Sequence, residues 1–134
     1  MSFKPQPYSL TFEFTGTNAL AAAIGATRTV GAQVPPDSDF QVHGIFGRSS
    51  LDTDLNAQFD NFQIQIQSQN DKIYMNNPVW RSNLLGTARN NAVNAYQGVV
   101  IEAGETINMT LTNGVAQANS VQIVIQGFLV PKSR

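Results

Sequence analysis

The chain contains no cysteine among its 134 residues. This absence excludes a disulfide framework, a thiolate metal site and a cysteine nucleophile, so the core must be held together by packing. Charge is scarce as well, because Asp, Glu, Lys and Arg make up 13% of the chain and the net charge is -1, whereas about a quarter of an average protein is charged. A nucleic-acid partner is therefore not expected, since phosphate contacts normally need a basic face.

Long apolar runs are also missing. No 18-residue apolar stretch occurs, and residues 1–10 lack the apolar segment of a signal peptide. The sequence therefore predicts no membrane span and a protein that is made and kept in a cytoplasm.

Signatures of catalysis are equally sparse. Neither G-x-S-x-G nor H-E-x-x-H occurs, and no phosphate-binding or dinucleotide-binding glycine motif is present. His43 is the only histidine. It could act as a general base or as a metal ligand, but without a second ligand a hydrogen-bonded structural role is favoured. We expect a protein that is not an enzyme and has no cofactor.

One segment has the spacing of a cation site. Asp52, Asp54 and Asn56 alternate as the first ligands of a calcium loop do. The sixth position of that motif is Ala57 where a sharp turn needs Gly, and the twelfth is Gln63 where a bidentate Glu belongs. A solvated loop is the favoured interpretation, and no metal site is predicted.

Neutral amides take the place of charge. The chain has 13 Asn and 12 Gln, so its surface must be covered largely by amides and hydroxyls. A monomer with almost no net charge has little self-repulsion. This composition favours a protein that works within an assembly.

Alternation of apolar and polar residues is the dominant pattern. In one stretch Phe62, Ile64 and Ile66 alternate with glutamines, which is typical of a strand with one buried face. Prolines, glycines and asparagines separate such stretches. The strands expected from this pattern cover residues 8–14, 26–34, 40–46, 58–68, 72–75, 98–101, 106–112 and 120–130.

Other segments are less regular. Residues 18–24 are predicted to form a loop or an extended crossing, and the change of parity at Gly44 indicates a bulge. Residues 47–56 are expected to form a polar loop. Residues 80–97 have no clear pattern, although Ser82 could cap a short helix through Leu84 and Leu85.

The stretch from Thr106 to Pro131 contains no charged residue. It includes Val121–Gln126, an uncharged, proline-free window of high β-propensity. Exposed at an edge, such a strand would recruit copies of itself. We therefore predict that it is paired on both sides, either within a sheet or across a subunit boundary.

Eight short strands with turns between them predict an all-β protein, and specifically an antiparallel, jelly-roll-like β-sandwich. The expected organisation is an N-terminal arm at residues 1–7, one sandwich domain at residues 8–131 and a C-terminal tail at residues 132–134.

Five stretches, which together span about residues 34–130, share a style of strands and turns: Val34–Phe40, Phe62–Ile66, Met75–Val79, Ile101–Ile107 and Leu111–Val115. In these stretches the chain resembles the small jelly-roll-like virion proteins of tailed bacteriophages, such as capsid decoration or cement proteins. The resemblance implies a virion structural protein that is made in a bacterial cytoplasm, docks on a major capsid protein or another virion component, and forms a homo-oligomer, with a trimer as the preferred state. It carries over no catalytic residue.

Aromatic residues beside amides mark the expected partner-binding surface. An aromatic next to Asn and Arg can anchor a protein contact or stack on a sugar ring, so a carbohydrate-binding module for host recognition is the alternative function. Trp80 could instead simply cover one end of the sandwich. The predicted interface residues are Tyr74, Met75, Asn76, Asn77, Trp80 and Arg81, joined by Phe3 and Lys4 of the N-terminal arm.

Overall fold

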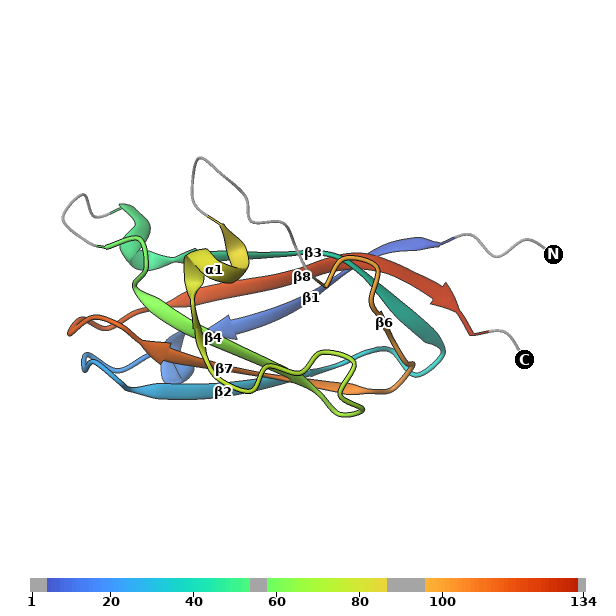
Figure 1. The fold of residues 1–134 in the computed structure, drawn as a ribbon, viewed down its shortest axis with the longest axis horizontal. Coiled ribbons are helices and arrows are strands. Elements are labelled where there is room, and N and C mark those ends of the chain that lie inside the picture. Colours follow the sequence, from blue (N-terminus) through green and yellow to red (C-terminus); the bar gives the residue numbers. More distant parts are fainter. Residues whose placement is uncertain (1–4, 54–57, 87–95, 133–134) are drawn as a thin grey trace.

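The computed structural model describes residues 5–53, 58–86 and 96–132, which form two four-stranded antiparallel sheets packed face to face (Figure 1). Sheet I has the strand order β1-β8-β3-β6 and sheet II the order β2-β7-β4-β5. The strands of sheet I are β1 (Gln6–Phe14), β8 (Val121–Pro131), β3 (Ser38–Ser49) and β6 (Val100–Ile101). Those of sheet II are β2 (Thr27–Gln33), β7 (Thr106–Asn113), β4 (Phe62–Ser68) and β5 (Val79–Trp80).

Strand pairing follows one nested rule. β1 pairs with β8, β2 with β7, β3 with β6, and β4 with β5, as if one long hairpin had been wound around a core. Winding then brings β3 beside β8 and β4 beside β7. These pairings are those of the double Greek key, so the structure confirms the predicted all-β, jelly-roll-like sandwich.

The core lies between the two sheets and is built by the alternation seen in the sequence. In β4 every second side chain is buried, and the intervening glutamines face outward. Each buried aliphatic or aromatic side chain contributes about 1.5–3 kcal/mol relative to its exposed state. The largest fully buried side chains are those of Phe12, Phe14, Phe40, Phe62, Leu20, Ile64, Ile66, Ile73, Ile101, Ile107, Met109 and Leu111.

The uncharged window Val121–Gln126 lies in the middle of sheet I. β8 is hydrogen-bonded to β1 on one side and to β3 on the other. Its backbone groups are therefore satisfied within the subunit, and the prediction that this segment is paired on both sides is confirmed.

The predicted bulge near Gly44 is also confirmed. In the β3–β8 ladder Val42 lies opposite Gly127 but Gly44 lies opposite Gln126, so His43 is the extra residue. The register shift lets Val42 and Ile45 both face the core in spite of their different parity.

Several predictions about strand extent were wrong. The strands predicted at residues 58–68 and 98–101 are shorter, because β4 begins at Phe62 and β6 covers only Val100–Ile101. β3 extends from Ser38 to Ser49, beyond both ends of the predicted strand 40–46 and into the predicted polar loop, because β8 is long enough to pair along its whole length. Residues 72–75 form no strand and contribute only an isolated bridge from Tyr74 to Gln67. The edge strand beside β4 is instead β5, which falls at the border of the segment predicted to be irregular.

Smaller elements complete the described fold. Two 3-10 turns cover Gly16–Asn18 and Ser50–Thr53, and the helix α1 covers Arg81–Leu85. β1 begins at Gln6, so two residues assigned to the N-terminal arm belong to sheet I.

Three connections meet at one end of the sandwich, which we call the loop end: the β1–β2 connection (15–26), the described parts of the β3–β4 connection (50–61) and the β7–β8 connection (114–120). Backbone hydrogen bonds join them, such as Leu20 N–H to the Asn119 carbonyl (2.9 Å) and Ser50 N–H to the Ser120 carbonyl (2.7 Å). The three connections of the loop end therefore hold one another in place through backbone hydrogen bonds.

Candidate functional site

The predicted interface segment runs along the free edge of β4. Tyr74 lies opposite Gln67 and Trp80 opposite Gln63. Tyr74 is 60% exposed and Trp80 is 40% exposed. Asn76 and Asn77, between them, are also exposed. These four side chains are available to a partner, and they are spread along an edge instead of converging on a pocket.

Met75 and Arg81 are corrections to the predicted interface. The side chain of Met75 belongs to the core, and Arg81 is only 3% exposed. Neither side chain can contact a partner without rearrangement. Phe3 and Lys4 lie outside the described residues.

Arg81, whose side chain is buried, forms an ion pair with the partly exposed Asp52, and its contacts join three segments. Its guanidinium donates two hydrogen bonds to the carboxylate of Asp52 (2.6 and 2.7 Å), and further bonds to the carbonyls of Phe59 (3.2 Å) and Gly47 (3.3 Å). It also lies 4.0 Å from the centroid of the Phe59 ring. A planar guanidinium can make all these contacts at once, which a lysine could not. Arg81 therefore clamps the start of α1 to the end of β3 and to the approach to β4.

A second carboxylate holds the same helix. The backbone N–H and the hydroxyl of Ser82 both donate to Asp60 (2.8 Å each). The predicted cap by Ser82 is not observed, because the N-cap residue is Trp80 and the acceptor comes from the β3–β4 connection. A five-residue helix has little stability of its own, so α1 depends on these contacts.

Buried asparagines connect the remaining loops. Asn119 donates to the side chain of Asn61 (3.0 Å) and accepts from Ser49 (2.5 Å). Asn113 donates to the carbonyls of Ala21 and Gln117 (2.8 Å each). Because buried amides are costly unless they are hydrogen-bonded, this network specifies one arrangement of the loop end.

The Asp52–Arg81 pair makes stability depend on pH. Burial by itself raises the pKa of Asp52, but hydrogen bonds from Arg81, Ser49 and Asn61 and the charge of Arg81 together outweigh it and hold that pKa below its ordinary value. A carboxyl group with a lowered folded pKa stabilises the protein above its unfolded pKa, and this stabilisation is lost as the pH falls through the folded value. We expect the stability gap between wild type and Asp52→Asn to be largest near pH 7 and to shrink below about pH 4.

Urea unfolding at a series of pH values measures this gap. Asp37→Asn is the matched control, because Asp37 is an exposed turn carboxylate with no ion pair among the described residues. A gap for Asp52→Asn that stays constant down to pH 2 would contradict the prediction.

Trp80 has a structural contact as well as an exposed face. A Cβ atom added at Gly114 would lie 2.8 Å from Cζ3 of Trp80, so the indole ring covers this glycine. We expect Gly114→Ala to push the ring outward, to shift the fluorescence of this single tryptophan to longer wavelength and to cost about 1 kcal/mol. Gly31→Ala is the control, because its added methyl group would lie close only to the side-chain oxygen of Asn108, and it should leave the emission unchanged. An unshifted emission in Gly114→Ala would show that the indole ring does not cover this glycine.

The outward face of sheet I is a second candidate surface, which the sequence analysis did not identify. It carries Phe46 (46% exposed), Phe128 (38% exposed), Val124 and His43, whose ring makes an edge contact with Phe128. Among the described residues no layer covers this face. The bulge shifts the alternation of inward and outward side chains along β3, and this shift could have predicted from the sequence that Phe46 faces solvent.

The outward face of sheet II is neutral and hydroxylated. Rows of side chains cross it from β2 through β7 to β4, for example Thr29, Thr110 and Gln65. The hydroxyls of Thr29 and Thr110 are hydrogen-bonded to each other (2.8 Å). A face without charge can be buried against another protein with little desolvation cost.

The described residues contain no group of three or more His, Asp or Glu side chains that could hold a metal ion. Asp52 is occupied by Arg81, and the other two residues of the calcium-like spacing, Asp54 and Asn56, lie outside the described residues. No helix in the described part of the chain is long and apolar enough to cross a membrane.

Comparisons of the chain with protein-family models, with curated proteins and with solved structures gave no match.

Proposed function

We propose that this protein is a structural component of a virus particle, which docks on a capsid or another virion component as a homo-oligomer. The observation that carries the proposal is the uncovered outer face of sheet I, where Phe46, Val124 and Phe128 lie among glutamines. Jelly rolls serve as capsid proteins and also as lectins, so the fold by itself is only an analogy. The uncovered outer face of sheet I is what supports the proposal.

The outer face of sheet I has the composition of a subunit contact. Its charged side chains lie at the strand ends, with Glu13 and Arg48 in one row and Asp39 near the opposite end. Its middle combines aromatic rings with amides, and interface centres are enriched in aromatics and depleted in charge. Such a face can be desolvated without stranding an ion.

Self-association is the first testable consequence. We expect purified protein to scatter light as a trimer of about 44 kDa, three times the chain mass of 14.6 kDa. The double variant Phe46→Gln/Phe128→Gln should remain folded and shift towards the monomer mass, because it removes the exposed rings without touching the core.

Ile24→Gln is the matched control, since Ile24 is an exposed apolar residue on the β1–β2 connection. It should leave the mass unchanged. A wild-type mass of one chain at micromolar concentration, or equal effects of the two sets of substitutions, would contradict the assignment of this face.

Docking is tested by co-sedimentation with isolated capsids. The edge formed by Tyr74, Asn76, Asn77 and Trp80 is the proposed contact with the capsid, while sheet I serves self-association. Trp80→Ala should reduce capsid occupancy, and Lys72→Ala is a control on the same connection. Because each docked subunit adds to the avidity of the oligomer, the loss should be larger than for a monomer.

Carbohydrate binding is the second candidate, and the exposed rings of Tyr74 and Trp80 favour it. Their positions opposite Gln67 and Gln63 separate them by four residues along β4, or about 13 Å. One sugar ring cannot contact both. Carbohydrate binding would become the favoured function if the wild type bound strongly to a glycan array, Trp80→Ala abolished that binding, and the variant still occupied capsids normally.

A further inference from the structure

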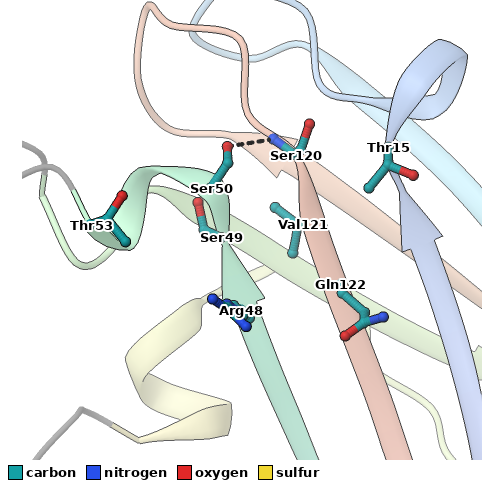
Figure 2. A pocket seen from close by; sticks show the side chains of 8 residues that line it. All are labelled: Thr15, Arg48, Ser49, Ser50, Thr53, Ser120, Val121 and Gln122. Carbon is teal, nitrogen blue, oxygen red and sulfur yellow. Dashed lines mark hydrogen bonds between the residues drawn. The ribbon is translucent and has the colours of Figure 1, made fainter.

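An open hollow of about 350 Å³ lies at the loop end of sheet I (Figure 2). It is formed where β1 ends, β3 runs into its 3-10 turn and β8 begins. Figure 2 shows Ser50 and Thr53 on one side and Thr15 on the other, with Val121 and Gln122 between them. Its lining residues are Thr15, Arg48, Ser49, Ser50, Thr53, Ser120, Val121 and Gln122.

Most of the polar groups in this lining are hydroxyls, and several are not used internally. Ser49 is engaged, because its hydroxyl donates to Asn119. Ser50 accepts a hydrogen bond from the backbone N–H of Ser120 (3.1 Å), which leaves its own proton free to donate. The hydroxyls of Thr15 and Thr53 have no partner among the described residues.

Arg48 is the only charged residue among the described residues of the lining. It is exposed and makes no ion pair among the described residues, in contrast to Arg81. The nearest carboxylate in its row is that of Glu13, which accepts a hydrogen bond from the intervening Gln122. Two strand spacings separate Arg48 from Glu13, or about 10 Å, so the guanidinium remains free for an outside partner.

We propose that this hollow binds a sugar unit that carries a carboxylate, such as a uronic acid. The guanidinium of Arg48 receives the carboxylate in a bidentate pair, and the free hydroxyls of Ser50, Thr15 and Thr53 exchange hydrogen bonds with the ring hydroxyls. The volume is at the lower end of the range for small-molecule sites and suits one ring. The site is separate from the proposed capsid contact. On sheet I it lies in the row of Glu13, Gln122 and Arg48 at the strand ends, beyond the Phe46 row of the proposed subunit contact.

The lining also argues against other ligands. Its described residues include no aromatic side chain, so a neutral sugar would lack the ring stacking that usually holds it. A single arginine gives little attraction for a polyanion, whose binding depends on many phosphate contacts.

Titration of the 15N-labelled full chain with D-glucuronate, followed by two-dimensional NMR, tests the proposal. We expect millimolar affinity with shifts confined to the lining residues. Arg48→Ala should weaken binding by about tenfold or more, since a hydrogen bond to a charged group contributes about 1.5–3 kcal/mol. Arg48→Lys should retain part of the affinity, because it keeps the charge and loses the bidentate geometry.

Arg28→Ala is the matched control, because Arg28 is an exposed arginine on β2 of the other sheet. It should bind as wild type does, and D-glucose should bind at least about tenfold more weakly than glucuronate. Inorganic phosphate that binds as tightly as glucuronate would overturn the sugar assignment. Equal losses in Arg48→Ala and Arg28→Ala, or no localised shifts in wild type, would overturn the site.

Discussion

Replacing Gly127 by Ala is expected to lower the free energy of unfolding by about 3 kcal/mol or more. Gly127 faces inward on β8, opposite the bulge in β3. An added Cβ would overlap the carbonyl oxygen of Gln41 and lie 3.0 Å from Cε1 of Phe40. A backbone carbonyl within a ladder cannot move aside as a flexible side chain can, so the two central strands of sheet I would have to separate.

Chemical denaturation monitored by circular dichroism measures this loss. Gly31→Ala is the control, since Gly31 lies on the edge strand β2 and its new methyl group would approach closely only the side chain of Asn108. It should change stability by less than about 1 kcal/mol. Similar losses for both variants would mean that the close approach of β3 and β8 is not the cause.

Asp52→Asn is expected to cost about 3 kcal/mol at pH 7, because it leaves the buried guanidinium of Arg81 without its counter-charge. The amide keeps nearly the shape of the carboxylate, so the loss reports the charge pair and not a cavity. The effect should concentrate at the loop end. Hydrogen exchange at residues 81–86 should therefore accelerate more than exchange at β7.

A double-mutant cycle separates the coupling free energy of Asp52 and Arg81 from the other contacts of each residue. Arg81→Met removes the charge and keeps an apolar side chain beside Phe59 and Phe62. The double variant Arg81→Met/Asp52→Asn should lose clearly less stability than the sum of the two single losses, because no unpaired charge is left buried. Additive losses would show that the ion pair has no net coupling and that the contacts of Arg81 with the Gly47 and Phe59 carbonyls dominate.

The loop end and the sheet faces have different physical characters. At the loop end, the hydrogen bond between Asn61 and Asn119 and the Asp52–Arg81 pair join the connections and hold them in one arrangement. The face of sheet I has few such constraints and exposes Phe46 and Phe128. A rigid frame that presents a neutral face is consistent with the proposed role of a subunit that packs against other subunits.

Alternation in the sequence was enough to determine the fold class and most of the strands. Because side chains point to opposite faces at every second residue, Phe62, Ile64 and Ile66 could belong only to a strand with one buried face. The same local argument placed the bulge near Gly44. The absence of charge from Thr106 to Pro131 predicted that Val121–Gln126 would be paired on both sides, since an exposed edge of that composition would aggregate, and the structure places it inside sheet I.

Only the tertiary structure decided what each polar side chain does. Arg81 follows an exposed aromatic and was therefore expected at the surface, yet its partner Asp52 is 29 residues away and meets it through the winding of the jelly roll. β5 could not be predicted either, because a two-residue edge strand has no periodicity and exists only through its pairing with β4. Likewise, the hollow beside Arg48 is assembled from the ends of three strands that are distant in the chain. Local patterns determine which way a residue faces, whereas long-range pairing determines what it meets there.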